Sequence, residues 1–443
     1  MRGAKAVIAA LLCVSFDKTI SIRASFIAGV TGAALLAGCA SAQTVALTNA
    51  TVIDGSGASM QRGVTIVVEG GRIREMGASA QAPSGATVID LAGKYVVPGI
   101  INGHGHVGPA PRDPQLRQYA LYGVTTTTSM YYDQDDIQQF KAAQKAGDLR
   151  GARILTVMYR FMSEPFRPGS EAKTPEEARA KVDEIVAKGA DMVKVWIDAQ
   201  GGRYPKLAPE FTAAVMDQAT KHNKIKTAHI VELEDAERIV DQGVNILAHN
   251  VRDKDIPDEF IATLKQKNVS VISTLAREEA MFTFGDGSNG PAFIDDPFFQ
   301  NALSSERLVA LRTTKHAEQA LDPMRPTYQR MFETDKRNVK RLLDAGIRLG
   351  FGTDSGGEPN RFFLQGWFEH HQMELLRDAG LSPMQIIQTF SKNNSEMLGI
   401  DKDFGTLAQG KAADLLVLTK NPLDDITNMR SLEVVYLGGK RFE

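Results

Sequence analysis

Two histidines, one residue apart, follow the first strongly apolar segment of the sequence. His104 and His106 end the run 97–106, and a single glycine separates them. Side chains along an extended strand alternate between its two faces, so residues i and i+2 point the same way. Two neutral imidazoles at the end of a strand are suitable ligands for a divalent metal. Histidine pairs also occur on protein surfaces without a metal, so this prediction depends on ligands elsewhere in the chain.

Further polar residues stand where other predicted strands end: Lys194, His229, His249 and Asp354. Each has an alternative role, because a lysine can reach solvent, a core histidine can be hydrogen-bonded, and an aspartate can cap a helix. Four of the eight histidines fall at strand ends, however, and this coincidence favours a shared metal site. The other four lie in predicted helices and are expected to be solvated or packing residues: His222, His316, His370 and His371.

Lys194 is the most informative of these residues. An ammonium group on a buried strand beside metal ions is desolvated and repelled. A neutral lysine can instead react with CO₂ to form a carbamate, an anion whose two oxygens can bridge two metals. Cys13 and Cys39 both lie in the first 42 residues, so no thiolate ligand is expected in the folded body. A site of histidine nitrogen and oxygen donors suits zinc.

From residue 98 the chain alternates strands with helical patterns such as 175–188, 209–221 and 234–242. This rhythm predicts an α/β fold, a (β/α)₈ TIM barrel over residues 98–404. The alternative is a doubly wound sheet, but the sequence has no Gly-rich phosphate-binding motif after its first strand. The predicted strands are Val96–Asn102, Val124–Met130, Arg153–Tyr159, Met192–Asp198, Ile225–His229, Asn245–Ala248, Val269–Ser273 and Arg348–Gly352.

Short β-type segments separated by turns occupy both ends of the body, residues 43–97 and 405–443. We expect the two ends to pair in one small β-sandwich domain. The long connection between the last two barrel strands has two parts. Ala276–Pro297 is predicted to be a loop over the barrel mouth, and Ser304–Leu343 is predicted to be largely helical.

Residues 1–42 have the character of an export signal. Lys18 and Arg23 precede the apolar stretch 24–37, and the following Leu-Ala-Gly-Cys resembles a bacterial lipobox that ends at Cys39. Cys39 would then be the lipidated first residue of the mature protein. The alternative is ordinary signal-peptide cleavage after residues 40–42, and the stretch is shorter than the roughly 20 residues of a membrane span. Either processing places the body in the periplasm or at the outer membrane.

The charge balance limits the classes of partner. The chain has 51 basic and 53 acidic residues and a formal net charge of −2, which is not the electrostatic signature of a nucleic-acid-binding protein. We therefore expect a small-molecule substrate, no nucleic acid, and membrane attachment only through a lipid anchor at Cys39. Self-association is left open.

The combination of these motifs resembles the amidohydrolase superfamily, specifically its imidazolonepropionase-like branch of metal-dependent hydrolases. The resemblance covers nearly the whole mature chain. It is carried by 97–106, by the spacing from His229 to His249, by Gly352-Thr353-Asp354-Ser355-Gly356, and by the returning β segment 410–418. The chain departs from the usual pattern at Asn102, where Asp is usual, at Asn250, where Gly is common, and at Val231, where a second histidine is often found.

The resemblance implies two zinc ions and hydrolysis by a hydroxide that bridges them. His104, His106 and Asp354 would hold one ion, and His229 and His249 the other. An N6-carboxylated Lys194 would bridge the two ions. Asp354 would be the catalytic residue that takes the proton during attack and delivers it to the leaving nitrogen.

The predicted reaction is hydrolysis of a C–N bond, in an amide, a cyclic amide or a related small molecule. Alternatives are an Xaa-Pro dipeptidase or carboxypeptidase-like peptidase, a phosphotriester or lactone hydrolase, and a catalytically inactive binding protein. The binding protein is disfavoured because such proteins lose ligands and this chain keeps all six. Candidate substrate contacts, which could equally be solvated loop residues, are Tyr131, Tyr159, Arg160 and Arg277.

Overall fold

A computed structural model describes residues 44–443, except 109–110, 132, 134–135, 164–171, 200–201, 203, 289 and 358–361. Residues 42–443 belong to one compact unit. The predicted leader, with Cys39, lies outside the described residues. No helix among the described residues is both long and apolar enough to cross a membrane.

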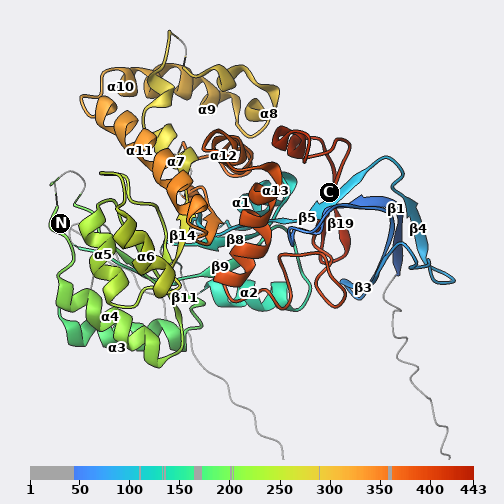
Figure 1. The fold of residues 1–443 in the computed structure, drawn as a ribbon, viewed down its shortest axis with the longest axis horizontal. Helices are drawn as coiled ribbons and strands as arrows, with labels where there is room; N and C mark the ends of the chain where they lie inside the picture. The colour runs from blue at the N-terminus through green and yellow to red at the C-terminus, as the bar shows by residue number, and fades with distance from the viewer. Residues whose placement is uncertain are drawn as a thin grey trace, which may run out of the picture. The chain divides into compact units, whose positions relative to one another are not determined.

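The middle of the chain is a mixed α/β structure with parallel strands (Figure 1). The largest parallel sheet has the strand order β10 (Arg160–Phe161), β11 (Met192–Trp196), β12 (Ile225–His229), β13 (Ile246–Leu247), β14 (Ser270–Ser273) and β15 (Leu349–Phe351). A second sheet consists of β6 (Ile100–Asn102), β8 (Val124–Ser129) and β9 (Arg153–Thr156), and a third of β7 (Gly105–Val107) and β16 (Ser355–Gly357).

Backbone hydrogen bonds join the two larger parallel sheets at both of their edges. The Gly103 N–H donates to the carbonyl oxygen of Phe351 over 2.9 Å, beyond the ends of β6 and β15. On the other side the Asp191 N–H donates to the carbonyl oxygen of Thr156 over 2.8 Å, between β9 and the residue before β11. These two hydrogen bonds connect the two sheets.

Helices connect the strands, as the sequence periodicity predicts for 175–188, 209–221 and 234–242. Thr174 accepts a hydrogen bond from the N–H of Glu177, and the two residues form a capping box that starts α3. The connecting helices are α1 (Asp113–Leu121), α2 (Asp136–Lys145), α3 (Pro175–Ala187), α4 (Pro209–Lys221), α5 (Leu233–Asp241), α6 (Asp258–Gln266) and α11 (Arg325–Asp344). After β16 come α12 (Trp367–Asp378), α13 (Pro383–Gln388) and α14 (Asn394–Met397).

The two ends of the body share one eight-stranded sheet. β5 (Tyr95–Pro98) pairs antiparallel with β17 (Leu415–Leu418), so the segment before the parallel strands and the segment after them are neighbours. Pairing of the two ends is thus observed, whereas a two-layer sandwich and the domain bounds stay predictions. The other strands are β1 (Val45–Val52), β2 (Gln61–Glu69), β3 (Arg72–Gly77), β4 (Thr87–Asp90), β18 (Leu432–Leu437) and β19 (Lys440–Phe442).

The first predicted strand, 96–102, is divided in the structure. β5 belongs to the eight-stranded sheet, and β6 belongs to a parallel sheet. Pro98 has no N–H to donate to a continuous ladder, and the N–H of Gly99 donates to the carbonyl oxygen of Asp414. A Cβ atom at Gly99 would lie 2.3 Å from Thr125 Oγ1, so the chain crosses between the sheets where only glycine fits.

The predicted loop Ala276–Pro297 contains helical turns instead: α7 (Leu275–Ala280) and the 3₁₀ turns η1 (Thr283–Gly285) and η2 (Ala292–Asp295). Phe284 and Ile294 in this stretch are buried, so packing against apolar neighbours orders a segment that is rich in glycine and aspartate. The following stretch is helical, as predicted, with α8 (Pro297–Gln300), α9 (Ser305–Ala310) and α10 (His316–Ala320) before α11. Figure 1 shows these helices stacked on one side of the parallel strands.

Candidate metal centre

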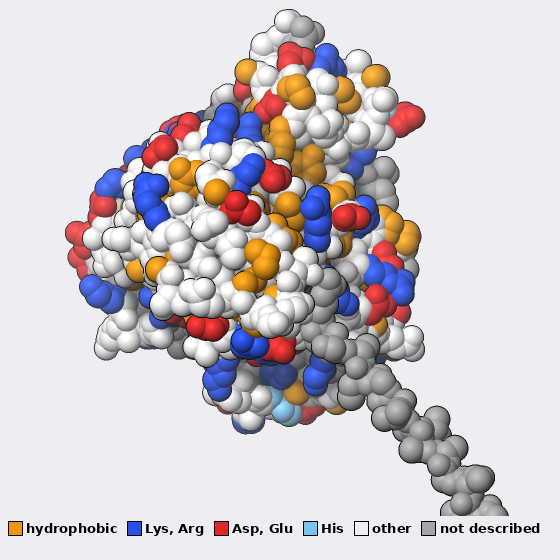
Figure 2. All heavy atoms as spheres, turned by 90° about the vertical axis from the view of Figure 1, so that its right-hand side faces the viewer, with side chains coloured by type: hydrophobic (Ala, Val, Ile, Leu, Met, Phe, Trp, Pro, Cys, Tyr) orange, Lys and Arg blue, Asp and Glu red, His pale blue; other side chains and the backbone are white. Residues whose placement is uncertain are grey.

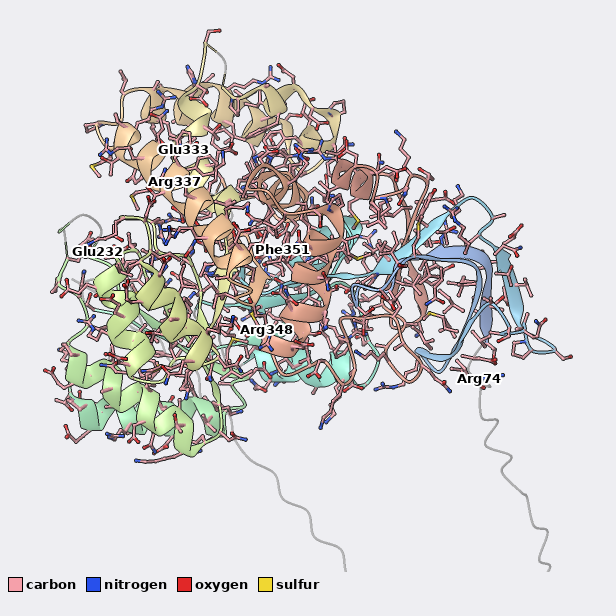
Figure 3. The ribbon with its side chains drawn as sticks, in the orientation of Figure 1. Arg74, Glu232, Glu333, Arg337, Arg348 and Phe351 are labelled. Carbon is pink, nitrogen blue, oxygen red and sulfur yellow. The ribbon has the colours of Figure 1, made fainter. Side chains whose placement is uncertain are left out.

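The parallel strands bring the six predicted metal-site residues to one end of the sheets. Carboxyl ends of neighbouring parallel strands lie at the same edge, and side chains there can converge. Figure 3 shows the direction of β15, with Arg348 just before it and Phe351 at its carboxyl end, which leads to Asp354. All six residues are at most 7% exposed: His104 after β6, His106 in β7, Lys194 in β11, His229 at the end of β12, His249 after β13 and Asp354 after β15.

The six side chains form one contiguous cluster. One ligand atom each from His104, His249 and Asp354 lies within 4.8 Å of the other two, a geometry that could hold a metal ion. The Nε2 atom of His106 lies 2.5 Å from Asp354 Oδ1. Lys194 Nζ lies 3.0 Å from His104 Nε2. The ring centroid of His229 lies 4.4 Å from that of His249, so this imidazole closes the group.

The Nδ1 atoms of His104 and His249 have hydrogen-bond partners, so the Nε2 atoms of these histidines are available to a metal. His104 Nδ1 lies 2.6 Å from the carbonyl oxygen of Ala248, which can only accept, so His104 donates from Nδ1 and its Nε2 carries the lone pair. His249 Nδ1 lies 2.7 Å from Thr274 Oγ1. The Nε2 atom of His249 is buried without a hydrogen-bond partner among the described residues. This donor set fits a divalent metal such as zinc.

Burial keeps these histidines in the neutral form that a metal requires. Burial lowers the pKa of His104 well below the usual 6.5, and the neighbouring Lys194 lowers it further. Burial, with smaller repulsion from His229 and His104, lowers the pKa of His249 in the same way. Burial also lowers the pKa of His229 to about 3, although Asp198, 3.4 Å away, opposes the shift. At pH 7 the imidazoles are therefore uncharged.

These shifts predict acid sensitivity of the metal-free protein. The pKa of His229 is 6.5 in the unfolded chain and about 3 in the folded protein. As the pH drops, the unfolded chain therefore binds a proton at this histidine before the folded protein does. Stability is thus complete above pH 6.5 and decreases below it, by about 2 kcal/mol at pH 5 from this one histidine. Thermal unfolding of chelator-treated protein at pH 7.5 and pH 5 measures this, and His229→Gln should reduce the difference. Equal melting temperatures at both pH values would contradict it.

Asp354 is held in an unusual backbone conformation at the end of β15. Its φ angle is +53°, in the left-handed region that few non-glycine residues adopt. Two N–H groups, those of Thr353 and Asp354, donate to the carbonyl oxygen of His104 over 3.0 and 2.7 Å. A Cβ atom at Gly352 would lie 2.6 Å from His104 Cβ, so glycine permits this approach. The turn is therefore docked directly on the chain that carries the histidine pair.

A chain of charged groups that the sequence analysis did not predict lies beside Asp354. Arg277 Nε lies 3.5 Å from Asp354 Oδ2, and its Nη1 lies 2.8 Å from Glu278 Oε2. Arg252 Nε lies 3.1 Å from the same Glu278 oxygen, and both of these residues are buried. The carboxyl of Asp335 is also buried, and burial raises its pKa to about 7. Of these charged residues, the sequence analysis named only Arg277 as a site residue. It expected Arg277 in a loop, and the structure places it in α7.

The predicted substrate contacts differ in their distance from the cluster. The guanidinium of Arg160 lies 4.7 Å from the ring centre of Tyr131 and 5.7 Å from that of Trp196. Tyr131 lies against His106, with ring centres 5.9 Å apart, and Trp196 lies 4.9 Å from His229. Tyr159 packs against Phe161 in the buried core.

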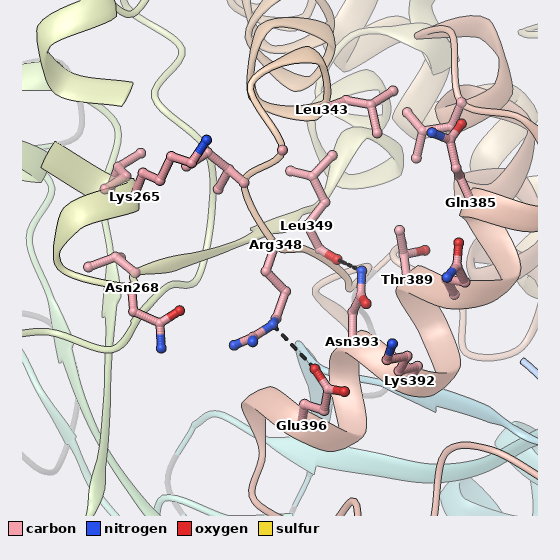
Figure 4. Close-up of a pocket in the computed structure, with 16 residues that line it drawn as sticks. Lys265, Asn268, Leu343, Arg348, Leu349, Gln385, Thr389, Lys392, Asn393 and Glu396 are labelled. Carbon is pink, nitrogen blue, oxygen red and sulfur yellow. Dashed lines mark hydrogen bonds and ion pairs between the residues drawn. The ribbon is translucent and has the colours of Figure 1, made fainter. Parts of the chain in front are cut away.

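A separate cavity of about 470 Å³ lies at the opposite ends of β14 and β15 (Figure 4). Arg348 and Glu396 form an ion pair of 3.4 Å at its wall, and Asn393 donates to the carbonyl oxygen of Leu349. None of the six cluster residues lines it. In folds of this kind the amino ends of the strands serve stability, and the carboxyl ends carry the chemistry.

Comparison with known proteins places the chain in a family. The sequence pattern of the Amidohydrolase family matches residues 95–441. The ochratoxinase of Aspergillus niger is 24% identical over 282 residues, which are 60% of this chain and 49% of that enzyme. The chain thus spans about half the length of this curated relative. Among solved structures, molinate hydrolase has a TM-score of 0.72 with 21% identity and covers 91% of this chain and 95% of its own. A Xaa-Pro dipeptidase with bound methionine has a TM-score of 0.70 with 19% identity over 90% of this chain and 100% of its own.

The chain belongs to the amidohydrolase family. His104, His249 and Asp354 form a candidate metal site in its structure.

Proposed function

We propose that this protein hydrolyses a C–N bond of a small-molecule amide at the cluster of six buried side chains described above. The observation that carries the proposal is the convergence of four buried histidines, Lys194 and Asp354 at the carboxyl ends of parallel strands. A buried polar atom without a hydrogen-bond partner is costly, and the Nε2 atom of His249 has no such partner among the described residues.

We further propose that the parallel sheets close into one (β/α)₈ barrel, and that the eight-stranded sheet folds over as a sandwich. The hydrogen bonds from Gly103 and Asp191 across the two sheet edges support closure. β1 pairs with β4 through Val45–Thr48 and with β5 through Thr51 and Val52. A strand that changes neighbours along its length in this way can take part in both layers of a sandwich. The fold of molinate hydrolase, which the chain shares over most of its length, agrees with this architecture.

The residues present fit two zinc ions bridged by an N6-carboxylated Lys194. His104, His106 and Asp354 would hold one ion, and His229 and His249 the other. Zinc bound here would supply a Lewis acid that polarises the scissile carbonyl and lowers the pKa of water toward about 7. Lys194 is 1% exposed and lies beside His104, where burial and bound cations would disfavour a charged ammonium, whereas the same cations would stabilise a carbamate anion.

Asp354 is placed to move the proton. Its Oδ1 faces His106 and its Oδ2 faces Arg277, so the carboxylate lies between the histidine pair and a cation. We assign it the role of accepting a proton from the attacking water and returning it to the leaving nitrogen. The short N–H contacts of the Asp354 turn to His104 keep this carboxylate fixed relative to the imidazoles.

The substrate class we propose is an amide that carries a free carboxylate, such as an N-acyl amino acid or a dipeptide. Arg277 supports it, because its guanidinium lies next to Asp354 and guanidinium groups recognise carboxylates by paired hydrogen bonds. Arg160, stacked between Tyr131 and Trp196, is a second cation near the histidines. The names ochratoxinase and Xaa-Pro dipeptidase among its relatives are compatible with this class.

A substrate panel with matched metal measurements tests the proposal. The zinc-supplemented protein should cleave N-acyl amino acids or dipeptides, and each N-acyl amino acid faster than its carboxamide. A chelator should abolish the activity and zinc should restore it. Cleavage of lactones or phosphotriesters alone would overturn the amide assignment. Fewer than about one metal per chain after zinc addition, with no turnover, would indicate a binding protein.

We also propose export of the mature body to the periplasm or outer membrane, with Cys39 as the lipid-anchored residue. On the face shown in Figure 2, positive and negative side chains are intermixed, which agrees with a small-molecule substrate and not a nucleic acid. Mass spectrometry of the mature N-terminus distinguishes lipidation at Cys39 from cleavage after residue 42. An intact Met1 on cytoplasmic protein would contradict export.

A further inference from the structure

Glu369 is a buried carboxylate that the proposed chemistry does not use. It is the third residue of α12 and is fully buried. Its Oε1 accepts hydrogen bonds from Asn102 Nδ2, Thr353 Oγ1 and Ser355 Oγ, each 2.7 Å long. Its Oε2 accepts from the N–H of Gly366 over 2.7 Å, at the start of the helix. Four donors satisfy this anion, although only the Gly366 contact is needed to cap the helix.

The other three donors connect Glu369 to both halves of the metal centre. The Asn102 Oδ1 atom accepts from the N–H of His104 over 3.0 Å, so the amide links Glu369 to the histidine pair. Thr353 and Ser355 are the residues on either side of Asp354, whose positive φ angle needs external support. One carboxylate on α12 thus fixes β6, which precedes His104, and the turn that presents Asp354.

We propose that Glu369 is a positioning residue for His104 and Asp354, and that Asn102 is its matched partner in this chain. The inference rests on the proposed metal-dependent hydrolysis. It also accounts for asparagine at the position before the histidine pair where aspartate is usual in the family. An aspartate at 102 would place a second buried carboxyl group 2.7 Å from Glu369 Oε1, and the two could be accommodated only if one of them took up a proton. Asparagine instead donates to Glu369 and still accepts from His104.

The exchange of the two groups provides the sharpest test. Asn102→Asp should impair the site by juxtaposing two carboxylates, and Glu369→Gln should impair it by losing an acceptor. In the double variant Asn102→Asp/Glu369→Gln, the new amide can donate to the new carboxylate, and the carboxylate can still accept from His104. The glutamine oxygen can accept from Gly366, and the hydroxyls of Thr353 and Ser355 can rotate to compensate. We expect the double variant to recover at least part of what each single variant loses.

The first measurement is zinc affinity, obtained by competition with a chelator. The second is kcat and KM at saturating zinc. Partners that orient metal ligands typically contribute 10–100-fold in affinity, so Glu369→Gln should weaken zinc binding by about that factor. Its kcat should fall at least about tenfold with a smaller change in KM, because the variant displaces the carboxylate of Asp354 and leaves the substrate pocket in place.

The control is Glu177→Gln, the same change at the same helix position of α3, where Glu177 accepts from the N–H groups of Lys173 and Thr174. It should leave both measurements unchanged.

Each result decides the proposal. Unchanged zinc affinity and kcat in folded Glu369→Gln would overturn it. If that variant does not fold, the double variant decides the question. Recovery of folding and zinc binding in the double variant supports the matched pair. A zinc affinity and kcat no better than those of the worse single variant overturn it. A wild-type protein that neither binds zinc nor hydrolyses any amide would be a distinct result, since it removes the proposed function and this proposal with it.

Discussion

Replacing Asp354 with asparagine is expected to lower kcat about 10³-fold while most of the bound metal is kept. The amide oxygen of asparagine can still face the metal, but it cannot accept the proton of the attacking water. Asparagine is also one of the non-glycine residues best tolerated at the φ angle of +53°, so the turn on His104 should survive. Steady-state kinetics and the metal content of the same preparation measure the two effects separately.

Asp217→Asn is a matched control for this experiment. Asp217 lies on the surface of α4, where it pairs with Lys221 over 3.0 Å. Its kcat and metal content should equal those of the wild type. If Asp354→Asn retained kcat within a factor of about ten, the proton would be carried by another group and the role of Asp354 would be wrong.

Lys194→Ala is expected to lower metal content and turnover together. The side chain is 1% exposed and its Nζ lies 3.0 Å from His104 Nε2, which places it beside the proposed ligands. Loss of a ligand that joins two ions should weaken metal affinity by at least about 100-fold, because even indirect partners contribute 10–100-fold. Metal analysis after dialysis and the rate at saturating substrate measure the loss. A carbon-labelled bicarbonate should give a carbamate signal in the wild type and none in the variant.

Lys226→Ala separates this effect from the removal of a buried lysine as such. Lys226 lies on the neighbouring strand β12, is 8% exposed, and donates from Nζ to Thr220 Oγ1 at 2.8 Å, away from the histidines. Its loss should lower the melting temperature and leave the metal content unchanged. Full activity of Lys194→Ala would show that the lysine does not bridge.

Some of the structure follows from local sequence alone. The bounds of β12 and α4 agree with the predicted 225–229 and 209–221, because a short strand and an amphipathic helix that starts at a proline are short-range properties. The six polar residues could be picked out for the same reason. Each one lies in or shortly after a strand, and parallel strands bring their carboxyl ends together whatever their distance in the sequence.

The partners of these residues depend on the tertiary structure. Asn102 and Glu369 are 267 positions apart, and the Arg252–Glu278–Arg277 contacts join a strand end to a segment predicted as a loop. The division of 96–102 between two sheets likewise depends on Asp414, which accepts from Gly99 near the end of the chain. Periodicity and turn residues report only on the nearest neighbours along the backbone. The sequence therefore determined which side chains could bind a metal and at which end of the strands they lie. Only the packing of distant segments decided which buried donors and acceptors hold them in place, because a buried polar group takes whichever partner the fold brings within hydrogen-bond distance.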